Sequence, residues 1–266
     1  MTLVELLVAT FLGLLVIGIG LGALMTSRQL TGTTSDATGL QQQAAYAFRV
    51  IGMQVRQAGS IELDLGDHAN PLDESAFEST FKAMDQVLLG IDAPDADDDE
   101  FALVVAHQNY VEPSTEIALA DLDPSNADQR GLMRDCLGEG GRHADAFITS
   151  AFRFKEPASG ADIATGALVC RGVNNSAQEL IRNVADFQVR YLEQTHAITR
   201  PTIVRRKAAD VGNWSRVIAA EVCLDMVGDE RMTIPESSDP DDPYGKYRSC
   251  TDEDDDLTPY GGRMHM

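Results

Sequence analysis

The first 25 residues, MTLVELLVATFLGLLVIGIGLGALM, are apolar except for Thr2, Glu5 and Thr10. An α-helix rises about 1.5 Å per residue, so this run is long enough to cross a bilayer. No basic segment precedes the run and no small-residue cleavage site follows it, unlike an ordinary secretory signal peptide. We therefore expect residues 1–27 to form a membrane-spanning helix, with Met1 as the N-terminus left after removal of a short leader.

A second apolar pattern predicts that this helix continues into a folded domain. Its members recur at steps of three and four, as on one face of a helix, and Gly59 is expected to stop it. They are Leu40, Ala44, Ala47, Phe48, Ile51, Val55 and Ala58. Residues 31–39, TGTTSDATG, are poor in helix formers and are expected to be a weak or stretched part. The two patterns together predict one helix of roughly 55 residues, with residues 28–59 as an amphipathic stem packed on a head.

The remaining residues, 60–266, read as a head of short strands separated by polar loops. Segments rich in β-branched and aromatic residues predict strands at 101–107, 146–154, 166–171, 187–194 and 216–227. In the last of these, alternation predicts one core-facing row, made of Ile218, Ala220, Val222, Leu224 and Met226. The expected fold is α+β, with the long N-terminal helix packed on the apolar side of an antiparallel sheet.

The net charge of the chain bears on whether it could bind nucleic acids. The chain has 21 basic and 42 acidic residues, a formal charge of −21. Nucleic-acid binding requires clustered Lys and Arg side chains that contact phosphates, so this acidic composition gives no strong indication of nucleic-acid binding. The one basic cluster, Arg200, Arg205, Arg206 and Lys207, is interpreted as exposed charges in a hairpin loop, in preference to a DNA contact.

Four cysteines, Cys136, Cys170, Cys223 and Cys250, lack the spacing of a zinc site. An even number in a chain that begins with a membrane-targeting segment predicts two disulfides formed outside the cytoplasm, the alternative being four buried free thiols. Three connectivities are possible. We favour Cys136 with Cys170 and Cys223 with Cys250, because each pair closes a short local loop.

Glu5 is the only charged residue in the apolar run. A carboxylate near the end of a lipid-embedded helix costs several kcal/mol unless it is paired, so Glu5 calls for a partner. The nearest positive charge is an α-amino group, either its own at Met1 or that of a neighbouring chain. The alternative is that the side chain reaches the lipid headgroups.

The string MTLVELLVA followed by an apolar helix resembles the mature start of type IV pilins and type II secretion pseudopilins. This resemblance implies cleavage by a prepilin peptidase, N-methylation of Met1, and pairing of Glu5 with the N-terminus of an adjacent subunit. It also implies residence in the inner membrane before assembly into an extracellular filament. Many major pilins carry a helix-kinking proline near position 22, where this chain has the glycines Gly18, Gly20 and Gly22, which can loosen a helix.

The head carries a second resemblance. The order of a loop at Cys136, the strand LVCRG, the segment ELIRNVADFQVRYLEQ and Trp214 before RVIAAEVCLDM is similar to that of PilW-like minor pilins. That family usually ends in a further strand with a terminal Arg-Asn, whereas this chain ends GGRMHM. The last strand is therefore expected to be either shortened or trimmed.

No motif in the chain indicates catalysis. The acidic run from Asp92 to Glu100 lacks the central Gly and the twelfth-position Glu of an EF-hand, so Asp95, Asp97 and Asp99 are weak metal candidates. A solvated charge run is the preferred interpretation, and the histidines show no paired metal spacing. We expect no enzyme activity and no cofactor.

The resemblances imply a structural subunit of a type IV pilus, of the PilW-like minor kind, that joins other pilin subunits through its helix and helps to initiate or cap the filament. Its system-level roles would be adhesion, twitching motility or DNA uptake. A type II secretion pseudopilin with a periplasmic endpoint is one alternative. The others are a major pilin with a large head, and a membrane-tethered enzyme or binding module.

Overall fold

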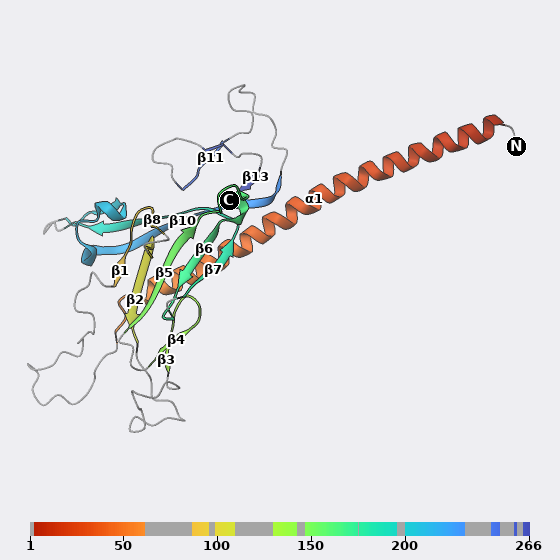
Figure 1. The fold of residues 1–266 in the computed structure, drawn as a ribbon. Coiled ribbons are helices and arrows are strands. Elements are labelled where there is room, and N and C mark those ends of the chain that lie inside the picture. The colour runs from red at the N-terminus through yellow and green to blue at the C-terminus, as the bar shows by residue number, and fades with distance from the viewer. Residues whose placement is uncertain are drawn as a thin grey trace, which may run out of the picture.

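A computed structural model of the chain describes residues 3–61, 87–95, 99–109, 130–142, 147–174, 176–195, 200–231, 246–250, 258–259 and 263–266. Within these ranges one long helix, α1 (Leu3–Gln57), precedes a set of antiparallel strands, so the fold is α+β as predicted (Figure 1). The strands are β1 (Leu88–Leu89), β2 (Leu103–Gln108), β3 (Arg130–Arg134), β4 (Gly140–Arg142), β5 (Phe147–Lys155), β6 (Ala167–Arg171), β7 (Ala177–Arg182), β8 (Val184–Gln194), β9 (Ile203–Arg206), β10 (Val217–Arg231), β11 (Lys246–Tyr247), β12 (Thr258–Pro259) and β13 (Arg263–His265). Short 3-10 turns lie at η3 (Ile163–Thr165), η4 (Ala208–Asp210) and η5 (Trp214–Arg216).

Helix α1 is continuous over 55 residues, which confirms the prediction of one long helix and makes it about 80 Å long. The expectation that residues 31–39 form a weak or stretched part is wrong, because they are helical. Thr31 and Thr38 donate their hydroxyls to the Ser27 and Thr34 carbonyls at 2.9 Å, so these polar side chains do not compete with the helix. Gly59 follows the helix with φ +73°, a conformation that favours glycine.

Two antiparallel sheets form the head. One has the order β1-β2-β5-β6-β7 and the other β13-β10-β8-β9. All five segments predicted as strands are strands, whereas most of the other strands, β7 and β9 among them, were not predicted. Asn183 joins β7 of the first sheet to β8 of the second, with φ +62°. Asparagine tolerates this left-handed conformation, which lets the chain turn abruptly between the two sheets.

The stem half of α1 supplies one side of the core. Every residue before Gly32 whose burial is described is exposed, and helical burial begins there. Leu40, Ala47 and Ile51 pack into the same cluster as residues of both sheets. The sheet residues include Leu103, Phe152, Leu168, Val184, Tyr191 and Met226. The head is therefore folded around the second half of the helix, while the first half extends away from it (Figure 1).

Two predicted core positions are wrong. Phe48 is 46% exposed, because the buried face of the helix is centred on Ala47, Val50 and Gln54 instead. Ile218 is 54% exposed, because the pairing of β10 with β8 shifts register between Val217 and Ala219. Such a bulge inserts an extra residue and breaks the simple alternation of faces.

Gln54 connects the helix to the head through buried polar contacts. Its side-chain nitrogen donates to the Arg134 carbonyl at 3.1 Å, and its oxygen accepts from the Ser150 hydroxyl at 2.9 Å. The same hydroxyl accepts from the Cys136 backbone N–H at 3.0 Å. Gln54 and Ser150 are both fully buried. Unpaired polar atoms would be costly there, so this chain of bonds fixes one register of the helix on the sheet.

The C-terminus ends in a short strand. β13 pairs with β10 at the edge of the second sheet, and Met266 exchanges two backbone hydrogen bonds of 3.0 Å with Met226. His265 lies 3.0 Å from the Asp225 carboxylate, which also accepts from the Tyr247 hydroxyl at 2.6 Å. The last strand is therefore short, as both alternatives expected for this end would give.

Candidate functional site: the apolar helix and its junction with the head

The most unusual surface of the molecule is the first half of α1. Leu3–Met25 has a mean hydropathy of 2.5, is long enough to span a membrane, and has none of its most apolar window buried within the chain. The large apolar side chains exposed here are Leu3, Val4, Leu6, Leu7, Val8, Phe11, Leu12, Leu14, Leu15, Val16, Ile17, Ile19, Leu21, Leu24 and Met25. Soluble monomers rarely expose an apolar surface this large, so it requires lipid or protein around it.

Glu5 lies in the first turn of α1, the end at which a helix favours negative charge. Thr10, the other polar residue of the span, donates its hydroxyl to the Leu7 carbonyl at 3.0 Å and is satisfied inside the helix. Glu5 is therefore the one group in Leu3–Met25 that carries a formal charge. Met1 lies outside the described residues, so its methylation and its pairing with Glu5 stay predictions.

The glycines of the span do not interrupt the helix. α1 runs through Gly18, Gly20 and Gly22, and a Cβ built on any of them would meet nothing within 4 Å. These glycines therefore have no packing role inside the chain. Their proposed loosening in a filament is not tested by an isolated chain and stays a prediction.

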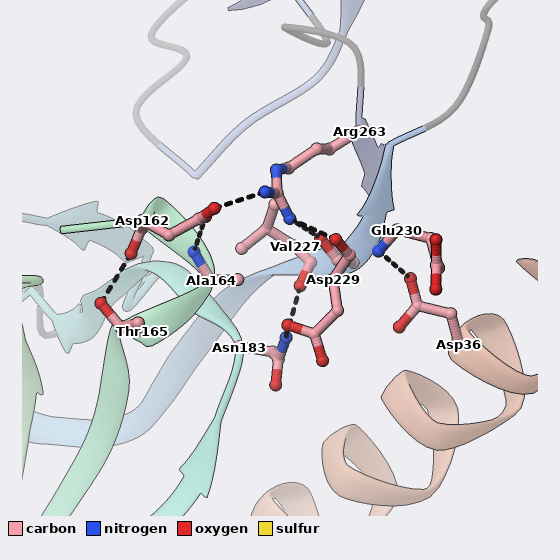
Figure 2. A network of polar contacts seen from close by, with 10 residues as sticks. Asp36, Asp162, Ala164, Thr165, Asn183, Val227, Asp229, Glu230 and Arg263 are labelled. Atoms are coloured by element: carbon pink, nitrogen blue, oxygen red, sulfur yellow. Dashed lines mark hydrogen bonds and ion pairs between the residues drawn. The ribbon is translucent and has the colours of Figure 1, made fainter. Parts of the chain in front are cut away.

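A polar network fixes the point where the helix leaves the head (Figure 2). Asp36 of α1 accepts from the Glu230 backbone N–H at 3.1 Å. A Cβ on Gly228 would overlap the Asp36 carboxylate, so a larger residue at this position would force the Asp36 side chain to move. This junction is not predicted from the sequence, because Asp36 lies in residues 31–39, which are poor in helix formers.

Arg263 of β13 braces the strand beside this junction. Its guanidinium donates to the Gly228 carbonyl at 2.8 Å and the Asp229 carbonyl at 2.7 Å, and pairs with the Asp162 carboxylate at 2.5 Å. Asn183 contributes from the link between the sheets, donating to the Asp229 carboxylate at 2.8 Å. As Figure 2 shows, these contacts join the C-terminal strand, η3 and β10 into one support for the base of the protruding helix.

The cysteines form the two pairs expected from their short loops. Cys136 is bonded to Cys170 with a Cα–Cα distance of 6.4 Å, and Cys223 to Cys250 with 5.6 Å. The first pair joins the loop after β3 to β6. The second ties β10 to the segment that carries Tyr247. Both pairs therefore stabilise the head and not the helix.

The weak metal candidates do not assemble a site in the described part of the chain. The Asp99 carboxylate pairs with Arg171, and Asp95 contacts Glu100 through its backbone. Among the described residues, no three His, Cys, Asp or Glu side chains come close enough to hold a metal ion. Asp97 lies outside the described residues.

The basic cluster of the sequence is partly neutralised on β9. Arg205 makes two contacts of 2.8 and 2.9 Å with Glu221, and Arg206 lies 2.8 Å from Glu193. Burial alone would raise the pKa of the Glu193 carboxyl. The N–H donors of Gly212 and Asn213, together with Arg206, hold that pKa below its ordinary value instead. Arg205 and Arg206 thus lie on β9 and not in a hairpin loop as expected, and each has an acidic partner.

The head also has a cleft of about 560 Å³. Its lining is both apolar and acidic, and includes Phe154, Phe187, Asp92, Asp95 and Asp186. Burial raises the pKa of the Asp186 carboxyl, with a further rise from Asp225 across the strand pair. The Asp92 carboxylate caps η4 by accepting from the backbone N–H groups of Ala208 and Ala209.

Comparisons with protein-family models, curated proteins and solved structures found no match. The function of the chain is therefore inferred from its own residues and geometry. Of the features above, the apolar helix makes the strongest demand on its surroundings, because it needs a partner for fifteen large apolar side chains.

Proposed function

We propose that this chain is a structural subunit of a type IV pilus-like filament, of the PilW-like minor pilin kind. One observation carries the proposal: a 23-residue apolar segment, wholly outside the head, lies on the same unbroken helix that forms part of the head's core. A simple anchor needs only a tether between membrane and domain. Here the helix is rigidly joined to the head by Asp36 and Gln54, so helix packing would set the position of the head.

The proposed mechanism is a transfer of the helix from lipid to a bundle of similar helices. Both environments are apolar, so the transfer needs no exposure of Leu3–Met25 to water. Glu5 favours the bundle over lipid, because its carboxylate pairs there with the N-terminal amine of a neighbouring subunit. Breaking such a buried pair leaves an uncompensated charge and costs about 3 to 5 kcal/mol.

The kind of subunit, and the filament system that contains it, are further parts of the proposal. A head of about 200 residues is large for a densely packed major subunit, which favours a minor subunit that initiates or caps the filament. A type II secretion pseudopilin would use the same helix and the same Glu5 pair. Shear separates the two, because a pilus subunit is released in extracellular filaments, while a pseudopilin stays in the cell envelope.

The substitution Glu5→Ala tests the role of the carboxylate. The variant should insert into the membrane as well as the wild type, because the apolar run is untouched. It should enter filaments poorly, and Glu5→Asp, which keeps the charge, should enter them better. Membrane fractionation and the subunit content of sheared filaments give the two readouts. Normal incorporation of Glu5→Ala would refute the assembly role of Glu5.

The cleft of the head supports a second candidate, a membrane-tethered binding module. Its volume of about 560 Å³ is in the range of small-ligand sites. In that case Leu3–Met25 is only an anchor, and any apolar helix of the same length would serve. Exchange of residues 1–25 for an unrelated apolar helix separates this candidate from the filament subunit.

A further inference from the structure

The charges of the chain are unevenly divided between helix and head. α1 carries Arg28, Arg49 and Arg56 against Glu5 and Asp36, a formal charge of +1. The whole chain has a formal charge of −21, so the residues outside α1 carry −22. The helix thus does not share the strong negative charge of the rest of the chain.

Two of these arginines lie on the stem face that points away from the head. Tyr46, Arg49, Met53 and Arg56 follow one another at steps of three, four and three, which places them on one side of the helix. We call these four residues the stem ridge. Tyr46 is 47% and Met53 44% exposed, and both arginines are exposed. The buried Ala47, Val50 and Gln54 lie on the adjoining face of the same turns.

Among the residues that the structure describes, the ridge arginines have no ion-pair partner, whereas several arginines of the head do. Arg171, Arg205, Arg206 and Arg263 each have a carboxylate partner within the head. Neither Arg49 nor Arg56 has an ion-pair partner among the residues that the structure describes, although the chain has 42 acidic residues. Within the described part of the chain, the ridge therefore offers two free guanidinium groups beside an aromatic ring and a thioether. Arginine, tyrosine and methionine are enriched at protein interfaces.

We propose that the stem ridge is a docking surface for the acidic head of a neighbouring subunit. This inference rests on the proposed function, since filament packing is what brings a second head beside the stem. The ridge lies on the same helix as the apolar segment, so neighbours that pack along Leu3–Met25 continue onto it. Heads of like charge repel one another, and the ridge provides a local site of opposite sign.

Anionic lipid headgroups are a less suitable occupant. Tyr46, the first residue of the ridge, lies 21 positions beyond Met25, which corresponds to about 30 Å along the helix. The attraction of a charged bilayer decays within a Debye length of about 8 Å at physiological salt. The ridge is thus too far from the membrane surface to be held by it when the span is embedded.

A photo-reactive residue in place of Met53, in the full-length chain, tests the identity of the partner. Cross-linking is carried out in membranes and in sheared filaments, and the linked peptides are identified by mass spectrometry. We expect links to acidic head peptides of another subunit, with a yield that falls at 1 M salt, where the Debye length is about 3 Å. Links to lipid alone, or only to peptides of the same chain, would overturn the proposal.

Charge reversal tests the role of the arginines. Arg49→Glu with Arg56→Glu should leave membrane insertion and both disulfides intact but lower incorporation into filaments on the order of tenfold or more, because like charges would then meet. Arg200→Glu with Arg216→Glu is the matched control, since both residues are exposed arginines of the head and the change in net charge is the same. Equal incorporation of the ridge variant and this control would refute the ridge.

Two further outcomes must be distinguished from a refutation of the ridge proposal. If the ridge variant does not fold, the Met53 cross-link alone decides. If the wild-type chain is absent from filaments while Met53 still cross-links an acidic head in membranes, the ridge stands and the filament proposal is overturned.

Discussion

Replacing Gln54 by methionine should destabilise the head, because Gln54 is the fully buried polar link between α1 and the sheets. The substitution keeps the length of the side chain and removes two hydrogen bonds, to the Arg134 carbonyl and from the Ser150 hydroxyl. Each neutral bond contributes about 1 kcal/mol, and a buried polar group left without a partner costs a further ~1 to 3 kcal/mol. We expect the free energy of unfolding to fall by about 3 to 5 kcal/mol in total.

Denaturant unfolding of the full-length oxidised protein in detergent measures this effect. Trp214, the only tryptophan, contacts the Tyr191 ring edge-on at 4.8 Å, so its fluorescence reports on the head. Gln42→Met is the matched control, because Gln42 is exposed on the same helix, and it should change stability by less than about 0.5 kcal/mol. Combining Gln54→Met with Ser150→Ala should show coupling of roughly 0.5 to 3 kcal/mol. A Gln54→Met protein as stable as the control would refute the anchoring role of this residue.

Three further predictions concern the head. Burial lowers the pKa of the His107 imidazole below its ordinary value despite Asp135 nearby, so the unfolded chain takes up the proton at a higher pH than the folded chain does. The free energy of unfolding should therefore fall as the pH drops below about 6.5, by at most ~1.4 kcal/mol per pH unit. His107→Gln should flatten this dependence between pH 7.5 and 5.5, and an unchanged slope would contradict the assignment. Peptide mapping without reduction should give Cys136–Cys170 and Cys223–Cys250, and removing either pair should cost about 3 to 4 kcal/mol by chain entropy, whereas detection of free thiols would argue against both. Arg263→Met should lower the free energy of unfolding by about 2 to 3 kcal/mol, because it removes two hydrogen bonds to carbonyls and an ion pair. Arg200→Met, at an exposed position, is the control, and equal denaturation midpoints for the two variants would show that Arg263 does not stabilise the head.

The sequence was most informative where one periodicity dominated. The apolar run from Met1 and the pattern beginning at Leu40 together predicted the long helix, and five strands were found from their β-branched and aromatic residues. Residues 31–39 were misjudged because local propensity is weak there. In the structure Asp36 and Gly32 contact the head strand β10, and such tertiary contacts outweigh propensity.

Positions decided by long-range contacts could not be predicted. The bulge that exposes Ile218 depends on how β10 pairs with β8, which no local alternation reveals. Gln54 was not among the predicted core residues, and its partners Arg134 and Ser150 lie 80 and 96 positions away. Arg263 likewise contacts Asp162 across 101 positions. The stem ridge could not be predicted for another reason. Whether Arg49 and Arg56 have ion-pair partners among the described residues can be determined only from the fold.

The most direct test of the filament proposal is to replace residues 1–25 by an unrelated apolar helix of equal length. Membrane insertion depends mainly on hydrophobicity and length, so the exchanged protein should still reach the membrane with both disulfides formed in its head. Helix packing depends on particular side-chain shapes, and Glu5 would be absent, so the protein should not enter sheared filaments that contain the wild-type chain. An exchanged protein that enters filaments as the wild type does would contradict the account and leave Leu3–Met25 as an anchor only.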